Sequence, residues 1–211
     1  MVPSAPGKRF PEDTKVTDML YKCYAEAEAG KNIEKSLKAI EERYNEIIKG
    51  LGLKLSLKEQ FETIKKNFEA LAGKDYAASR GEYLNGIIMA NYLGYEFIDA
   101  ATVICFDKDG EFDSEKTNAV CEAKFANIER AVVPGFYGAM PNGKVKTFSR
   151  GGSDVTGSIV ARALKADMYE NWTDVSGFLA ADPRIVNNAK PINVITYKEL
   201  RAVSYTHLTL P

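Results

Sequence analysis

Histidine is nearly absent from this sequence, since its one copy, His207, lies close to the C-terminal end. Catalysis by a Ser-His-Asp or Cys-His arrangement and metal binding by histidines are therefore excluded. The three cysteines are widely spaced and form no Cys-x-x-Cys pair, which argues against a disulfide framework or a zinc site and predicts small buried thiols. Any chemistry must use charged side chains, backbone amides and the positioning of substrates.

Long apolar runs and an excess of basic residues are also missing. No run is long enough to cross a bilayer and the N-terminus has no signal-peptide pattern, so we expect a cytoplasmic protein. Lysine plus arginine number 28 against 29 aspartate plus glutamate, which argues against a nucleic acid or a membrane surface as partner. The 211 residues suit one globular domain with a sizeable core, or one domain plus a fragment.

Helical periodicity dominates the N-terminal part, and strands alternate with helices after it. Apolar spacing and glycine stops predict helices near 19–30, 33–49, 57–71 and 75–92. Beyond them we expect strands at 101–106, 131–134, 145–147, 168–172 and 191–195, with helices at 114–130 and from about 154 to 164. Such alternation predicts an α/β fold with parallel strand pairing.

The segment 147–160 has the clearest chemical pattern. Gly151 and Gly152 immediately precede a predicted helix, so the backbone can approach a ligand closely. The amides and the dipole at a helix start favour a phosphate or a carboxylate. Arg150 adds a planar fork for a carboxylate, and Asp154 could help to hold a metal or orient a lysine near phosphate. An ordinary loop-to-helix turn is the alternative.

Three further segments carry weaker signals. Thr173 and Asp174 follow a predicted strand, where ligands bind in open α/β sheets, and Arg184 comes after an Asp-Pro turn. The glycines of segment 134–138 allow a close approach to a substrate or simply a tight turn. Glu82 could bind an amine, although a solvated glutamate has the same sequence signal.

Taken together and in order, these segments resemble the catalytic domain of aspartokinases, which belong to the amino-acid kinases. The matching motifs are Ser4-Ala-Pro-Gly7, Thr17-Asp18, Gly81-Glu82, Gly135-Phe136, Arg150-Gly-Gly-Ser-Asp154, Thr173-Asp-Val175 and Ala181-Asp-Pro-Arg184. The resemblance covers about residues 2 to 201. It implies a three-layer α/β/α sandwich with a mainly parallel central sheet and transfer of phosphate from ATP to the side chain of L-aspartate, with Mg²⁺.

The resemblance also implies roles for individual residues. The aspartate pocket would be formed by Ser4, Thr17, Glu82, Phe136, Arg150, Gly151 and Ser153. Glu82 would face the substrate ammonium, and Arg150 its α-carboxylate. Asp154 would organise the catalytic centre. The nucleotide would contact Gly152, Thr173, Asp174 and Arg184. The metal ligands stay unassigned.

Several features depart from the family pattern. The Lys-Phe-Gly-Gly motif that ends the family's first strand does not occur, so we expect that strand to be missing. The C-terminal regulatory domains are expected to be absent, and residues 202–211 to be a non-native tail after a partial catalytic domain, 1–201. We therefore expect this fragment to be inactive and poorly stable, and the intact enzyme to be a homo-oligomer. Leu179 stands where many relatives have a tyrosine.

Two alternatives remain open from the sequence. One is another amino-acid kinase, acting on glutamate, carbamate or uridylate. The other is a non-catalytic module that binds a nucleotide or an amino acid.

Overall fold

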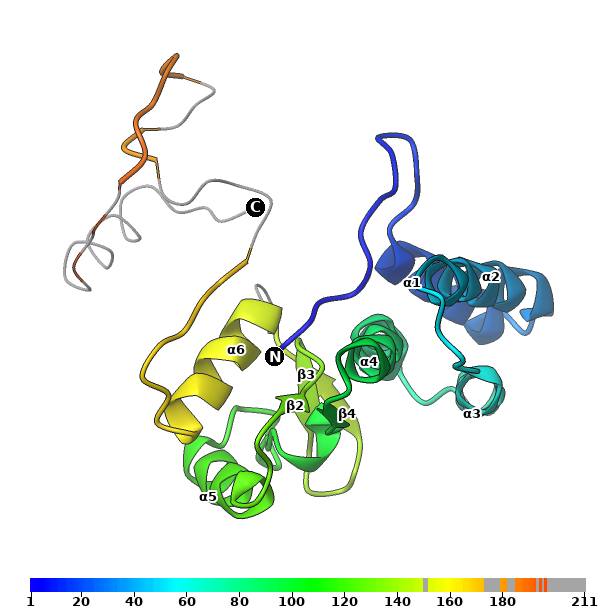
Figure 1. Cartoon of the computed structure of the whole chain (residues 1–211). Coiled ribbons are helices and arrows are strands. Elements are labelled where there is room, and N and C mark those ends of the chain that lie inside the picture. Colours follow the sequence, from blue (N-terminus) through cyan, green and yellow to red (C-terminus); the bar gives the residue numbers. More distant parts are fainter. Residues whose placement is uncertain (150–151, 173–178, 182–184, 193, 195, 197–211) are drawn as a thin grey trace. The chain divides into compact units, whose positions relative to one another are not determined.

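The computed structural model describes residues 1–149, 152–172, 179–181, 185–192, 194 and 196. The chain divides into two compact units, Met1–Tyr169 and Glu170–Pro211. Among the described residues, the helices and strands lie in the first unit, which runs from blue to yellow in Figure 1. The predicted boundary at residue 201 lies outside the described residues and stays a prediction. The described residues of the candidate site belong to the first unit.

Four helices follow one another in the N-terminal part, as the periodicity predicts. They are α1 (Val16–Glu28), α2 (Glu34–Gly50), α3 (Lys58–Glu69) and α4 (Lys74–Leu93). Gly94 ends α4 in the left-handed conformation, with φ of 67°, which a residue without a β-carbon adopts at little cost. In the described part of the chain, no helix is both long and apolar enough to cross a bilayer.

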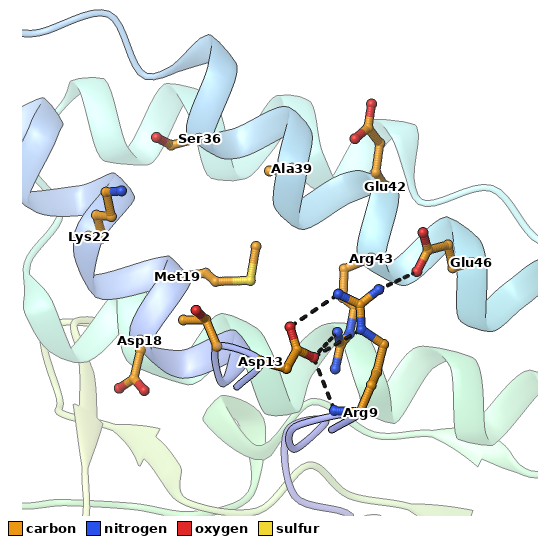
Figure 2. A pocket seen from close by; sticks show the side chains of 11 residues that line it. Arg9, Asp13, Asp18, Met19, Lys22, Ser36, Ala39, Glu42, Arg43 and Glu46 are labelled. Atoms are coloured by element: carbon orange, nitrogen blue, oxygen red, sulfur yellow. Dashed lines mark hydrogen bonds and ion pairs between the residues drawn. The ribbon is translucent and has the colours of Figure 1, made fainter. Parts of the chain in front are cut away.

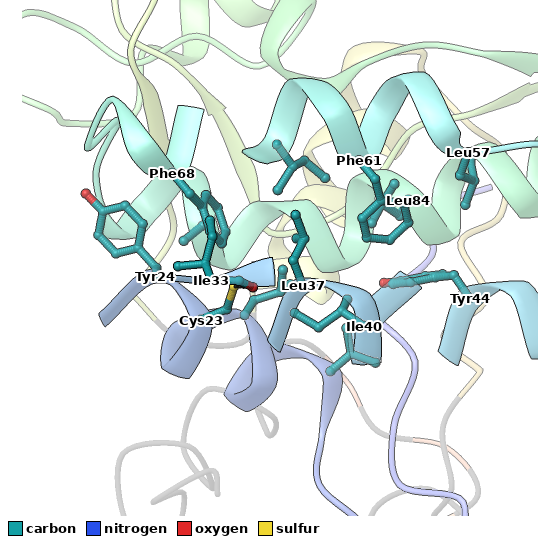
Figure 3. Packing of buried hydrophobic residues seen from close by; sticks show 14 of the residues in the cluster. Cys23, Tyr24, Ile33, Leu37, Ile40, Tyr44, Leu57, Phe61, Phe68 and Leu84 are labelled. Atoms are coloured by element: carbon teal, nitrogen blue, oxygen red, sulfur yellow. Dashed lines mark hydrogen bonds between the residues drawn. The ribbon is translucent and has the colours of Figure 1, made fainter. Parts of the chain in front are cut away.

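A first hydrophobic core lies between these four helices (Figure 3). The rings of Tyr24 and Phe68 meet edge to face, with centroids 5.3 Å apart. Leu20, Ile40 and Ile64 are fully shielded from solvent in the same core. Each helix contributes apolar side chains from one face, which is the arrangement that helical periodicity predicts.

The helix α4 differs from its neighbours because it is buried on more than one side. It packs on α1 and also on β4 and β2, so its buried residues do not form a single stripe. Small residues permit this close packing. At Gly86, for example, an added β-carbon would lie 2.7 Å from the ring of Pro134. The helix is thus the element shared between the helical part and the strands.

A short parallel pair of strands follows α4. The strands are β1 (Glu96–Phe97) and β2 (Ala131–Val132), and α5 (Ser114–Phe125) lies between them in the sequence. Parallel strands need such a crossover connection. The pairing confirms the predicted parallel arrangement, although α5 ends earlier than the predicted helix 114–130. The residues before Gly7, here called the N-terminal segment, line the free edge of β2.

The contacts of the N-terminal segment follow a parallel ladder. The terminal amino group of Met1 donates to the backbone oxygen of Ala131 at 2.7 Å, and the N–H of Val133 donates back to the oxygen of Met1 at 2.9 Å. The N–H of Gly135 then donates to the oxygen of Pro3 at 3.0 Å. One ladder bond is missing because proline has no N–H. The segment therefore extends the sheet up to the candidate site.

A hairpin and a further helix complete the first unit. Strands β3 (Tyr137–Ala139) and β4 (Val145–Thr147) pair antiparallel, and α6 (Gly152–Ala163) follows. A parallel bridge between Cys105 and Ala139 joins the connection between β1 and α5 to β3. A second core lies here and includes Val103, Ile104, Phe106, Cys121, Val133 and Tyr137. The described strands are short and form two small sheets.

Two predicted strands are wrong. In segment 101–106, the side chain of Asp99 accepts a hydrogen bond from Ala101 N–H and starts a 3₁₀ helix, η1 (Ala100–Thr102). Backbone pairing with another strand begins only at Cys105, which forms a bridge with Ala139. Segment 168–172 is not a strand, because its apolar side chains are exposed rather than buried; Trp172 is 89% exposed. The predicted strand at 191–195 is described only in part.

Candidate active site

The first wall of the candidate site is formed by α4 and the N-terminal segment. At Gly81, an added β-carbon would lie 2.8 Å from the side chain of Ala5, so only glycine permits this approach. One turn along α4, the amide nitrogen of Asn85 donates to the backbone oxygen of Ser4 at 2.6 Å. These contacts hold Ser4 beside the helix that carries Glu82.

Glu82 is a buried carboxylate whose hydrogen-bonding capacity is only partly used. The residue is 7% exposed, and its Oε2 atom has no hydrogen-bond partner. Burial raises the pKa of Glu82 to about 7; backbone N–H groups, including that of Ala5, and the charge of Arg80 limit the rise. A solvated glutamate is thereby ruled out. An ammonium group would supply both the missing donor and the missing charge.

The start of α1 approaches the same part of α4. Thr17 lies in the first turn of α1, next to Val16, whose side chain is 3.8 Å from the position of a β-carbon on Gly81. Tyr21 lies one turn further on the same face. Burial raises the pKa of Tyr21, and nearby carboxylates, Glu82 among them, raise it further. The sequence reasoning missed Tyr21, which its spacing from Thr17 could have indicated.

The second wall is formed by the turn before β3 and the start of α6. A β-carbon on Gly135 would lie 2.6 Å from the Oγ atom of Ser153, and one on Gly152 would lie 2.8 Å from the Cα atom of Phe136. The N–H of Phe136 donates to the hydroxyl of Thr156 at 3.0 Å. Phe136 also has a φ of 78°, a strained value for a bulky residue that is often found at functional sites.

The start of α6 presents backbone amides and an acidic side chain. The helix begins at Gly152, slightly earlier than predicted, so Ser153 and Asp154 lie in its first turn. The first N–H groups of a helix have no partner within it and carry partial positive charge. Asp154 is exposed and makes no ion pair with another described residue. This turn can therefore receive an anion beside a free carboxylate.

Tyr169 covers the outer side of this turn, and the sequence reasoning missed it as well. Its hydroxyl donates to the backbone oxygen of Asp154 at 3.4 Å. A β-carbon on Gly157 would lie 2.5 Å from the same hydroxyl, so glycine is needed for the ring to sit there. No motif at residue 169 indicates this contact.

The N-terminal segment joins the two walls. The N–H of Gly135 donates to the backbone oxygen of Pro3 on one side. On the other side, the next residues, Ser4 and Ala5, contact α4. The structure thus brings Ser4, Thr17 and Glu82 to one wall and Phe136, Gly152, Ser153 and Asp154 to the other. No hydrogen bond or ion pair between described residues links Glu82 to Asp154. The predicted site residues Arg150, Gly151, Thr173, Asp174 and Arg184 lie outside the described residues.

A separate cavity of about 390 Å³ opens between the loop at residues 9–14, α1 and α2, and none of the predicted site residues that the structure describes lines it (Figure 2). The buried guanidinium of Arg43 forms an ion pair with Asp13 and donates to the backbone oxygen of Gly7 at 2.7 Å. Arg9 binds the same carboxylate from the outside, at 2.9 Å. These charges pair with one another, and we interpret the ion pairs beside the cavity as contacts that hold the loop on α2.

The model of the amino acid kinase family matches residues 13–209. Aspartokinase 3 of Bacillus subtilis is 37% identical over 97% of this chain and 48% of its own length. The crystal structure of aspartate kinase from Clostridium acetobutylicum is 56% identical, with a TM-score of 0.90 over 97% of this chain and 47% of that one.

A more distant solved structure has the same fold. Aspartokinase III of E. coli, crystallised with lysine and aspartate, is 25% identical, with a TM-score of 0.64 over 90% of this chain and 46% of that one. The chain spans about half the length of the relatives it matches. These matches confirm the α/β fold and the resemblance to aspartokinases. The chain belongs to the amino acid kinase family.

Proposed function

We propose that this chain carries the aspartate-binding part of an aspartokinase, which transfers the terminal phosphoryl group of ATP to the side-chain carboxylate of L-aspartate. The observation that carries the proposal is Glu82, a buried carboxylate with an unpartnered oxygen. The α-ammonium group of aspartate would supply the missing partner. The aspartokinases among the relatives, one of them crystallised with aspartate, support this substrate.

The other site residues take the roles that the family pattern implies. Around Glu82, the amino acid would meet Ser4, Thr17, Phe136, Arg150, Gly151 and Ser153. The nucleotide would meet Gly152, Thr173, Asp174 and Arg184. Arg150 suits the α-carboxylate because its guanidinium fork matches a planar anion. The products would be 4-phospho-L-aspartate and ADP, made in the cytoplasm at the first step towards lysine, threonine and methionine.

The chemistry needs positioning more than proton transfer. The side-chain carboxylate of aspartate is already ionised at neutral pH, so it requires no general base, and the near-absence of histidine is no obstacle. The chain must hold this carboxylate in line with the phosphate and stabilise negative charge on the transferring group. Backbone N–H groups in the first turn of α6 are suited to that task.

Mg²⁺ would accompany the nucleotide and neutralise charge on its phosphates. A magnesium ion bound in this way commonly uses one or two carboxylates, together with phosphate oxygens and water. The exposed carboxylate of Asp154, in the same turn as the phosphate-binding amides, fits one such position. The described residues contain no cluster of three potential metal ligands, and a site completed by nucleotide phosphates does not require one.

The test is ADP release by the protein that the complete gene encodes, with aspartate, glutamate, carbamate, uridylate or no acceptor. We expect release that depends on aspartate, and loss of aspartate affinity in the variant Glu82→Gln. Glu69→Gln, an exposed glutamate on α3, is the matched control and should behave as the wild type. Preferential use of another acceptor would replace the substrate assignment. Binding without turnover would favour a non-catalytic module.

A further inference from the structure

Arg80 is a buried cation on α4 whose charge acts on the carboxylate of Glu82 without forming an ion pair with it. The residue is 6% exposed, and it makes no ion pair with any residue that the structure describes. Its Nε and Nη2 atoms donate to the hydroxyl of the neighbouring Ser79 at 3.2 and 3.0 Å. Removing a charge from water is costly unless other groups compensate for it. Its surroundings must therefore provide that compensation.

Three tyrosine rings surround the guanidinium group. Its carbon lies 4.5 Å from the ring centre of Tyr76 and 4.4 Å from that of Tyr83, which are one turn away on the same helix. The third ring, that of Tyr137 on β3, is 5.3 Å away. Each ring face attracts a cation, and the attraction is stronger where water is excluded. The contact with Tyr137 joins α4 to the strand.

Tyr137 is itself fixed in place. The residue is fully buried, and its hydroxyl donates to Oδ1 of Asp99 at 2.7 Å. The same oxygen accepts from the N–H of Ala101 at the start of η1. A continuous series of contacts therefore runs from Arg80 through Tyr137 and Asp99 to the start of η1. None of these side chains belongs to the family motifs.

The two ends of the Arg80–Tyr137 contact stand next to the two walls of the site. Successive residues of a helix are rotated by about 100°, so Arg80 and Glu82 point to opposite sides of α4. Tyr137 directly follows Phe136, the strained residue of the second wall. Near the start of α4, Asp75 accepts a hydrogen bond from Thr147 at 2.9 Å and forms a second tether to the hairpin. Together the tethers restrict rotation of α4.

We propose that Arg80 is a positioning residue, which sets the orientation of Glu82 relative to Phe136 through its contact with Tyr137 and so determines the affinity for the amino acid substrate. This inference rests on the proposed function. Arg80 touches no substrate, because it is enclosed between α4 and β3. Its loss should weaken binding of the amino acid and leave the nucleotide site, on the α6 side, largely unchanged.

The test uses steady-state kinetics of the protein from the complete gene, with aspartate and ATP varied in turn. For Arg80→Met, which keeps the length of the side chain but not its charge, we expect KM for aspartate to rise about tenfold while KM for ATP changes less than about twofold. Arg80→Lys retains a cation and should restore much of the affinity. Tyr137→Leu removes the partner ring and should reproduce the effect.

Phe125→Leu is the matched control, because it removes a buried ring from the same core without touching the Arg80 contacts. It should lower stability but leave both KM values unchanged. Equal changes of both KM values, or the same change in Phe125→Leu as in Tyr137→Leu, would overturn the inference and indicate a purely structural role. If Arg80→Met does not fold, the KM values of Arg80→Lys and Tyr137→Leu test the inference instead. A wild type without aspartate-dependent turnover would instead overturn the proposed function.

Discussion

Gly135 and Ser153 approach so closely that a β-carbon on Gly135 would lie 2.6 Å from the Ser153 hydroxyl and 2.7 Å from its Cα atom. The second of these atoms is backbone and cannot move without shifting the start of α6. The glycine is therefore required by the spacing between the turn and the helix, rather than by its own φ. This spacing places the orphan amides of α6 beside the turn that leads to Phe136.

Replacing Gly135 with alanine should consequently move the start of α6. We expect Gly135→Ala to lower the free energy of unfolding by about 1–3 kcal/mol, the usual cost of overpacking, and to reduce aspartate-dependent turnover. Urea unfolding and the ADP assay measure the two effects. Gly50→Ala in α2 is the control, since an added β-carbon there meets nothing within 4 Å. Equal stability and activity in both variants would contradict the packing argument.

The sequence predicts the elements whose pattern is local. The four N-terminal helices follow from apolar residues at helical spacing and from glycine stops such as Gly94. The start of α6, predicted near residue 154 and observed at Gly152, follows from the glycine pair that precedes the predicted helix. These features depend on residues near one another in the chain, so one sequence is enough to find them.

The features that the sequence reasoning missed depend on distant partners. The sequence around Arg80 does not indicate that this residue is buried, and only the fold reveals the ring of Tyr137 beside it. The expected strand after Asp99 is interrupted because that side chain starts a 3₁₀ turn. Tryptophan is a residue type that is common in strands, but Trp172 is exposed. Neither contact nor exposure could be read from spacing alone.

The pH dependence of aspartate use should report the ionisation of Glu82. Burial raises its pKa to about 7, and only the ionised carboxylate attracts an ammonium group. We expect kcat/KM for aspartate to fall about tenfold per pH unit below that value and to level off above it, because this ratio reports the free enzyme. In Glu82→Gln the profile should be low and flat. A wild-type profile without a bend between pH 6 and 8 would contradict the assignment.

The raised pKa of Glu82 also means that its ionised carboxylate destabilises the fold at pH values above about 7. The pKa of Glu82 is about 4.5 in the unfolded chain and about 7 in the folded protein, so the folded protein holds this proton more tightly. The free energy of unfolding therefore decreases as the pH rises from about 4.5 to about 7. Glu82→Gln should therefore raise stability at pH 8, by up to about 3 kcal/mol, and have little effect at pH 4. Thermal unfolding of both proteins at the two pH values gives the comparison, and a destabilised variant at pH 8 would refute it.

Substitution of Asp154 should change catalysis without changing stability. Its carboxylate is exposed in the first turn of α6, so Asp154→Asn should leave the melting temperature nearly unchanged. If the carboxylate organises the reacting groups, kcat should fall by about 100-fold, while KM for aspartate changes little. Glu115→Gln removes an exposed acid from the equivalent turn of α5 and controls for the loss of a helix-dipole interaction. A similar kcat in both variants would mean that Asp154 acts only as a favourable charge at the helix start.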